Sequence, residues 1–236
     1  MEQGLGFAHY LTQTDGVGKA VLVALLLLSL ASWYLIITRT LANTLARLRA
    51  NAFLRRAREA GSIADLRRTL SSQQTDNAFA RLVQQAAAAA EEVERQSVEG
   101  LALAGGMAEY LTRVLSNEID QEASRSDYGL TVLATAGSTA PYVGLFGTVW
   151  GIYHALVQIG MSGQGTLDKV AGPVGEALIM TALGLAVAIP AVLAYNAFNR
   201  RNRIWLSRLE AFAHDLYVLV TVKAGAGQVQ PALRQG

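Results

Sequence analysis

Three long stretches of the chain carry almost no charged side chains, and more polar segments separate them. Residues 20–37 contain no charge, and residues 128–167 contain none apart from His154. Residues 170–199 contain only Glu176. A helix needs about 20 apolar residues to cross a hydrocarbon layer about 30 Å thick. The pattern therefore predicts an all-α integral membrane protein with three transmembrane helices, at residues 20–38, 128–159 and 171–199.

Basic residues decide the expected orientation, because lysine and arginine near span ends mark the cytoplasmic side. Lys19 alone precedes the first span, whereas Arg39 follows it at once and an arginine cluster follows the third. A fourth crossing within residues 128–167 would move that cluster outside, so we expect three. The predicted periplasmic parts are the N-terminal segment 1–19 and a short turn at 160–170; the cytoplasmic parts are 39–127 and the C-terminal helix and tail 200–236.

The central segment, residues 39–127, is predicted to form a cytoplasmic helical domain. It contains no proline, and its apolar residues recur at helical spacing. Gly61–Ser62 and Ser71–Ser72 are expected breaks between short helices. The last helix is expected to continue unbroken through Asp127 into the second span. The periodic apolar positions are Leu41, Leu45 and Leu48, then Leu101, Ala104, Ala108, Leu111 and Leu115.

Composition and the absence of known motifs exclude several kinds of chemical site. Hydrophobic residues make up 52% of the chain and charged residues 16%, and there is no cysteine, which excludes disulfides and thiolate metal sites. No Gly-rich phosphate loop, paired histidines or serine elbow is present, so we expect no enzyme activity, cofactor or metal. The sequence pI of about 9.0 reflects membrane sidedness rather than nucleic-acid binding. Of the scattered histidines His9, His154 and His214, His154 is expected to be an interfacial residue.

Small residues and prolines repeat on one side of the second and third spans. In membranes, helices associate by close backbone approach at small residues, because lipid is as apolar as leucine. The spacing predicts two smooth faces that pack together and contribute to contacts between subunits. The expected packing residues are Gly137, Pro141, Gly144, Gly147, Gly151, Gly184, Ala188 and Pro190.

Three polar groups fall at about the same depth. Counting about 1.5 Å per residue from Asp127 and Arg200, Thr148 lies roughly 32 Å along the second span, and Thr181 and Glu176 roughly 29 and 36 Å along the third. Two interpretations of Glu176 stay open. It is either a helix-start residue favoured by the helix dipole after Pro173, or a sheltered acid that exchanges protons.

Two motifs carry a resemblance to a known family. The segments APYVGLFGTVWGI at 140–152 and VAGPVGEALIMTALGLAVAIPAVLAYN at 170–196 resemble the MotA/TolQ/ExbB proton-channel family. The resemblance implies that Glu176 is the channel acid, that Thr148 and Thr181 are the threonines of the pathway, and that protons are the coupling ion with no other cofactor.

The segment GTLDKVAGPVGEALIMTA favours the ExbB-type branch of that family. This branch implies a homo-oligomeric, pentameric ring in the bacterial inner membrane, which encloses ExbD and drives TonB to energise import of iron-siderophores and vitamin B12. A TolQ-type subunit of the Tol-Pal system and a non-conducting membrane scaffold remain alternatives, while three spans rather than four disfavour the MotA type. Separately, anionic phospholipid headgroups are expected near Arg200, Arg201 and Arg203.

Overall fold

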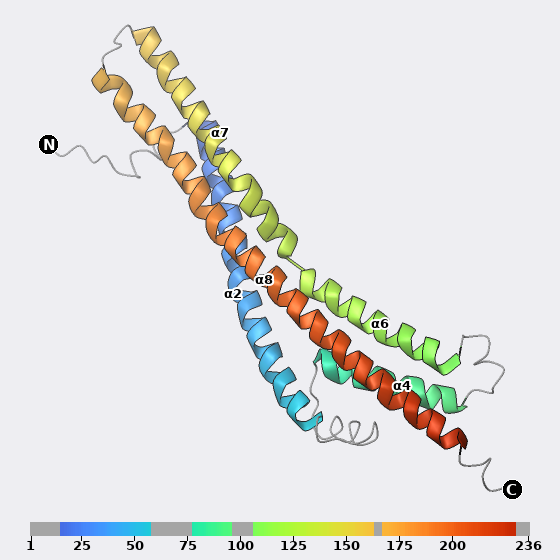
Figure 1. Cartoon of the computed structure of the whole chain (residues 1–236). Coiled ribbons are helices and arrows are strands. Elements are labelled where there is room, and N and C mark those ends of the chain that lie inside the picture. The colour runs from blue at the N-terminus through green and yellow to red at the C-terminus, as the bar shows by residue number, and fades with distance from the viewer. Residues whose placement is uncertain (1–14, 58–76, 96–105, 163–166, 230–236) are drawn as a thin grey trace, which may run out of the picture. The chain divides into compact units, whose positions relative to one another are not determined.

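Every secondary-structure element that the structure describes is a helix. The computed structural model describes residues 15–57, 77–95, 106–162 and 167–229. The helices are α2 (Gly16–Ala57), α4 (Ala78–Arg95), α6 (Gly106–Asp127), α7 (Leu130–Ser162) and α8 (Leu167–Val229) (Figure 1). Three segments are long and apolar enough to cross a membrane, in Gly16–Ala57, Gly106–Met161 and Val170–Thr221. The predicted all-helical chain with three membrane-capable segments is confirmed.

The chain divides into two compact units. The membrane unit comprises Met1–Arg39 and Gly129–Asn199, and the polar unit comprises Thr40–Tyr128 and Arg200–Gly236. Two boundaries, at Arg39 and Asn199, fall next to the expected ends of the first and third spans. Neither α2 nor α8 is interrupted at its boundary.

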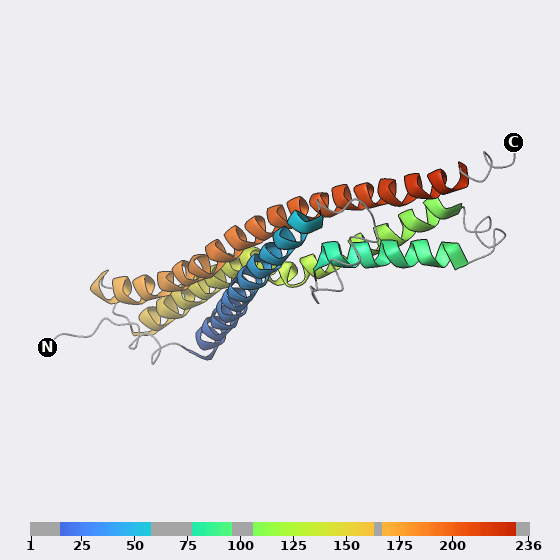
Figure 2. The same cartoon turned by 90° about the horizontal axis from the view of Figure 1, so that it is seen from below.

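In the membrane unit, α7 and α8 lie side by side in both views (Figures 1 and 2) and meet at two glycines. A Cβ added at Gly144 would lie 2.6 Å from the carbonyl oxygen of Met180, and one added at Gly184 would lie 2.6 Å from that of Ala140. Neither contact has room for a side chain. The helices therefore touch backbone to backbone, as small residues permit in membranes.

The other small residues extend this contact. A Cβ at Gly151 would lie 3.1 Å from the Cβ of Ala177, and one at Gly137 would lie 2.4 Å from a methyl group of Val192. At Gly147 it would meet Val21 of α2 at 2.9 Å. Gly147 is therefore where α2 packs onto α7.

Two clusters of apolar side chains complete the membrane unit. Val21 and Leu25 of α2 pack with Ala140, Met180 and Ala188. The second cluster combines all three helices through Leu130, Leu133, Ala136, Ala191 and Phe198, with Leu28 and Leu35 against them. The opposite faces carry large exposed apolar side chains, among them Leu26, Leu30, Tyr142, Phe146, Leu185 and Leu193. Such surfaces suit contact with lipid.

Prolines lie inside both long apolar helices without ending them. Pro141 is within α7, and Pro173 and Pro190 are within α8. Each lacks the backbone N–H that would bond the carbonyl four residues earlier. Pro141 and Pro190 are half-buried in the membrane unit.

The expected unbroken helix from the central segment into the second span is wrong. α6 ends at Asp127 and α7 begins at Leu130, and Gly129 between them has φ of +75°. This left-handed conformation favours glycine and terminates helices. A Cβ at Gly129 would also lie 2.8 Å from a terminal methyl group of Leu35 on α2, so a larger residue would require that side chain to move.

The periodic apolar residues of the central segment divide into two groups. Leu111 and Leu115 are buried, whereas Ala108 and the three leucines at 41, 45 and 48 are exposed. The α2 face that enters the core of the polar unit instead carries Ala50 and Phe53. Leu101, Ala104 and the expected breaks at 61–62 and 71–72 lie outside the described residues.

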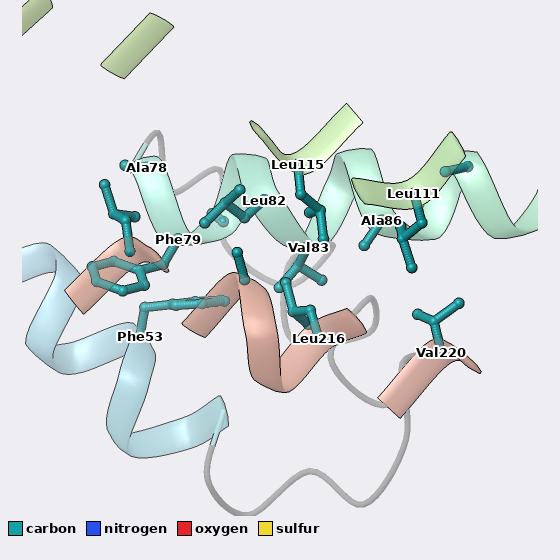
Figure 3. Packing of buried hydrophobic residues seen from close by; sticks show 14 of the residues in the cluster. Phe53, Ala78, Phe79, Leu82, Val83, Ala86, Leu111, Leu115, Leu216 and Val220 are labelled. Carbon is teal, nitrogen blue, oxygen red and sulfur yellow. The ribbon is translucent and has the colours of Figure 1, made fainter. Parts of the chain in front are cut away.

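The polar unit has a conventional apolar core. Phe53, Phe79, Leu82, Leu115 and Leu216 point toward one another from α2, α4, α6 and α8 (Figure 3). Edge-to-face ring contacts reinforce it, with centroids 5.2 Å apart for Phe79–Trp205, 5.3 Å for Phe79–Phe212 and 6.4 Å for Phe53–Phe212.

Polar contacts fix α6 to its neighbours beside this core. The Nε of Arg81 on α4 donates to Glu118 Oε1 at 2.6 Å, and its Nη2 donates to Glu122 Oε2. Glu122 Oε1 also accepts a bond from Trp205 Nε1 at 3.1 Å. The amide of Asn202 on α8 donates to the carbonyl of Ser126 at 2.6 Å. The last turns of α6 are thus tied to both α4 and α8.

We expect Gly184→Ala to destabilise the membrane unit by about 1–3 kcal/mol, because the new methyl group must push two backbones apart. Gly160→Ala is the matched control, since a Cβ there meets nothing within 4 Å. Thermal unfolding of the detergent-solubilised chain, followed by helical circular dichroism, measures both. Equal melting temperatures for the two variants would show that the Gly144–Gly184 contact is unimportant.

Candidate functional site

The hydroxyls of two threonines, one buried and one half-buried, meet between α7 and α8. Thr148 Oγ1 lies 2.7 Å from Thr181 Oγ1, 3.0 Å from the carbonyl oxygen of Ala177 and 3.2 Å from that of Gly144. Thr148 is 5% exposed. A hydroxyl has one hydrogen and accepts two bonds. When Thr148 donates to a carbonyl, Thr181 must donate to Thr148, so the pair has two interchangeable donor patterns.

The glycine contact explains why these hydroxyls meet. Thr148 lies one turn after Gly144, and Thr181 lies about one turn before Gly184. Close approach of the backbones at the glycines brings the threonines within hydrogen-bond distance. The carbonyl of Ala177 is reached across the same interface, because Ala177 faces Gly151.

Glu176 is well inside α8 rather than at its start. The helix begins at Leu167, nine residues earlier, so Pro173 does not open it. The helix-start interpretation of Glu176 is therefore wrong, because the helix dipole acts on charges within the first turn. The half-buried Glu176 is the only charged residue among residues 170–199.

The structure brings the threonines together but does not join them to the carboxyl. At about 100° per residue, Glu176 is rotated about 140° around α8 from Thr181. Among the described residues, no hydrogen bond or ion pair reaches Glu176. The carboxyl thus points toward the side of α8 opposite Thr181, although it is only one residue before the carbonyl to which Thr148 bonds.

The sequence analysis missed Asp15, which joins α2 to α7. Its Oδ1 accepts a bond from the Gly18 N–H at 2.8 Å and so caps α2. Its Oδ2 accepts a bond from Trp150 Nε1 at 2.6 Å. The indole stacks on His154, with ring centroids 5.8 Å apart. An aspartate before a long apolar run is a recognisable helix-start signal, but nothing local in the sequence indicates its tryptophan partner.

These contacts lower the pKa of Asp15 from the ordinary value of 3.8. The hydrogen bond from Trp150 is the largest cause. Burial acts in the opposite direction, and the Gly18 N–H and the positive charges of His154 and Lys19 lower the pKa further. Asp15 is therefore held ionised at the head of α2.

The remaining predicted groups lie apart from this site. Arg200, Arg201 and Arg203 are exposed on α8, at the start of its polar-unit half. Over the residues that the structure describes, no group of histidine, aspartate and glutamate side chains is arranged to hold a metal ion.

The sequence pattern of the MotA/TolQ/ExbB proton channel family matches residues 51–211, which include both threonines and Glu176. This chain belongs to the MotA/TolQ/ExbB proton channel family. The site just described therefore lies in the matched part of a proton-channel family member. As a member of that family with three membrane-capable helices, it is a multi-pass protein of the inner membrane.

Relatives within the family point to the ExbB type. The chain is 45% identical over 204 residues to the biopolymer transport protein ExbB of Neisseria meningitidis, covering 86% of this chain and 92% of that protein. It is 39% identical over 221 residues to ExbB of Xanthomonas campestris, covering 90% and 87%. The Tol-Pal system protein TolQ of Pseudomonas aeruginosa is more distant, at 34% identity over 205 residues, covering 86% and 87%. The predicted resemblance to ExbB is confirmed.

The two threonine hydroxyls should be energetically coupled. In a double-mutant cycle of Thr148→Val and Thr181→Val, we expect a coupling free energy of about 0.6 kcal/mol, the usual size for hydrogen bonds between membrane helices. Unfolding of the four proteins in detergent with increasing denaturant measures it. Additive effects of the two changes would show that the hydroxyls do not interact, and a cycle with the exposed Thr139→Val in place of Thr181→Val provides the uncoupled control.

Asp15 should make stability depend on pH at the acidic end. Because its pKa is lower in the folded state, its contribution is fully present above the ordinary aspartate pKa and is lost as the pH falls through the folded value. We expect the melting temperature of the wild type to fall more between pH 6 and pH 3 than that of Asp15→Asn. The exposed Asp215→Asn should behave like the wild type. Identical pH profiles for the wild type and Asp15→Asn would contradict this prediction.

Proposed function

We propose that this chain is the channel-forming subunit of a proton-driven inner-membrane complex, with Glu176, Thr148 and Thr181 on the proton pathway. One observation carries the proposal. A single carboxyl lies on the helix that also carries one member of an interhelical hydroxyl pair, in a membrane unit whose third helix has no other charge over residues 170–199.

Ionising that carboxyl inside a membrane costs free energy. An ionised side chain at the centre of a bilayer costs about 3 kcal/mol on insertion scales, and such acids usually face a cavity or another chain and handle protons or ions. Among the described residues, no basic side chain is paired with Glu176. A proton is then the counter-charge available to it. The hydroxyl pair can exchange its two donor patterns without breaking the helix contact, which suits a relay.

A single copy leaves the pathway incomplete. Glu176 is half-exposed on the three-helix unit rather than enclosed by it, so other chains must shelter it from lipid and bulk water. The proposal therefore includes a homo-oligomeric ring, expected to be a pentamer, that surrounds the membrane helices of ExbD. The N-terminus is periplasmic and the C-terminus cytoplasmic, as the basic residues favour.

The similarity to ExbB-type relatives suggests how the energy of proton flow is used. Each proton that crosses a potential of 100 mV releases about 2.3 kcal/mol. The complex would pass this energy to TonB, which energises import of iron-siderophores and vitamin B12 across the outer membrane. The second candidate is a TolQ-type subunit of a Tol-Pal system, favoured by the 34% identity to TolQ over most of the chain.

Replacing the carboxyl tests the pathway. Glu176→Gln keeps the shape of the side chain but cannot ionise, so we expect TonB-dependent siderophore uptake to fall to background while the ring still assembles. The control is Glu210→Gln, the same change at an exposed position of the same helix, which should retain uptake. Uptake at the wild-type level in Glu176→Gln would reject the proposal and leave the scaffold alternative.

Complementation of cells that lack either subunit distinguishes the two candidate systems. The wild-type chain should restore uptake in cells that lack their ExbB-type subunit, and should restore detergent resistance only weakly in cells that lack their TolQ-type subunit. The reverse result would favour the TolQ type.

A further inference from the structure

A small cavity lies in the polar unit between α2, α6 and α8. Its volume is about 50 Å³. A water-sized group needs roughly 10–15 Å³ of such space, so about four fit. The four oxygens of a phosphodiester need comparable room. The polar residues that line the cavity are Asn43, Arg47, Glu122, Ser126, Arg201 and Asn202.

The charges of the lining favour an anion. Arg47 is half-buried and Arg201 exposed, and in the part of the chain that the structure describes neither guanidinium has a hydrogen bond or an ion pair. Glu122 is the one acid in the lining, and both of its oxygens are engaged, by Arg81 and by Trp205. The cavity therefore offers two unpartnered cations beside a carboxylate whose two oxygens already accept hydrogen bonds.

The amide of Asn202 also lines the cavity. It is 7% exposed, and its nitrogen donates to the carbonyl of Ser126. This bond holds α8 against α6, so the backbone that carries Arg201 is fixed in place. A guanidinium presents several N–H donors in a fork that matches phosphate oxygens, and such bonds are among the strongest in proteins.

The position along the helices identifies the source of the anion. Arg201 is two residues past the membrane unit on α8, and Asn43 is four residues past Arg39 on α2. At about 1.5 Å per residue, these residues lie roughly 3–6 Å beyond the apolar spans. The backbone of Arg47, eight residues past Arg39, lies about 12 Å beyond, and its long side chain leans back toward the N-terminus of α2 and so toward the span. The polar headgroup layer on each side of a bilayer is of similar thickness, about 5–8 Å. The phosphate most available at this level belongs to a lipid.

We propose that this cavity binds the phosphate of an anionic phospholipid, held between Arg47 and Arg201. Basic pockets of this kind on the cytoplasmic side of membrane helices suit such headgroups. The geometry differs from the expectation based on sequence, in which Arg200, Arg201 and Arg203 were equivalent. Only Arg201 of the three lines the cavity, and Arg47, from a helix more than 150 positions earlier, joins it.

Arg47 and Arg201 line the cavity and Arg200 and Arg203 do not, so the latter two provide control variants. The full chain, purified in detergent, is titrated with phosphatidylglycerol or with phosphatidylcholine, and bound lipid is measured by native mass spectrometry. We expect phosphatidylglycerol to bind more tightly, and Arg47→Ala or Arg201→Ala to weaken it about tenfold. Arg200→Ala and Arg203→Ala, which remove the same charge outside the cavity, should change it by no more than about twofold.

A further variant guards against loss of folding in the arginine variants. Asn43→Asp keeps the size of the side chain and both arginines but adds a negative charge to the cavity wall, so it should also weaken phosphatidylglycerol. Circular dichroism establishes that each variant is helical. Unchanged binding in a helical Asn43→Asp variant would overturn the proposal.

Three other results would also overturn it. Equal losses in all four arginine variants would mean diffuse attraction to the membrane surface. Displacement of the lipid by millimolar inorganic phosphate would assign the cavity to a free anion. A lipid bound by the chain alone but absent from the complex purified with its partner proteins would assign the cavity to a carboxylate of a partner.

Discussion

The backbone contact between Gly144 and Gly184 is the constraint on which the membrane unit depends. Helices in lipid gain little from burying apolar side chains, so they must be held by close packing and hydrogen bonds. The two glycines let α7 and α8 approach until a Cβ on either would meet the other backbone at 2.6 Å. Thr148 and Thr181 hydrogen-bond only because the helices are this close. α2 packs against the same pair of helices through Val21, which lies over Gly147.

The polar unit is stabilised differently, because its surroundings are water rather than lipid. Its apolar core, which includes Phe53, Phe79 and Leu216, is stabilised by the hydrophobic effect. Arg81 bridges two carboxylates on α6, and Trp205 and Asn202 on α8 complete the polar contacts. α2 and α8 belong to both units, and their side chains change from exposed leucines to arginines and buried aromatics without a break in the helix. The break between α6 and α7, at Gly129, falls where the Leu35 side chain of α2 packs closely against the turn.

Some polar groups of the membrane unit have hydrogen-bond partners within the chain, and Glu176 does not. This difference distinguishes groups with a structural role from a candidate functional group. The hydroxyls of the threonines bond to each other and to carbonyls, and Asp15 caps α2 while it accepts the indole N–H of Trp150. Glu176 has no such partner among the described residues. A group that is fully bonded within one chain needs no further explanation, whereas a lone carboxyl on a membrane helix requires a partner from outside the chain. Under the proposed function, a proton and a helix of another chain would meet that requirement.

The sequence by itself determined what depends on composition and local spacing. Three runs with almost no charged residues predicted the membrane-capable helices, the glycine and threonine spacing predicted the packing faces, and the motif around Glu176 indicated the family. The tertiary structure decided which side chains meet across helices. Trp150 reaches Asp15 across 135 positions, and Arg47 shares a cavity with Arg201, because helix rotation and crossing determine such pairs and neither is encoded in neighbouring residues. The left-handed turn at Gly129 and the burial of Phe53 instead of Leu48 had the same origin: each depends on the helix that lies opposite.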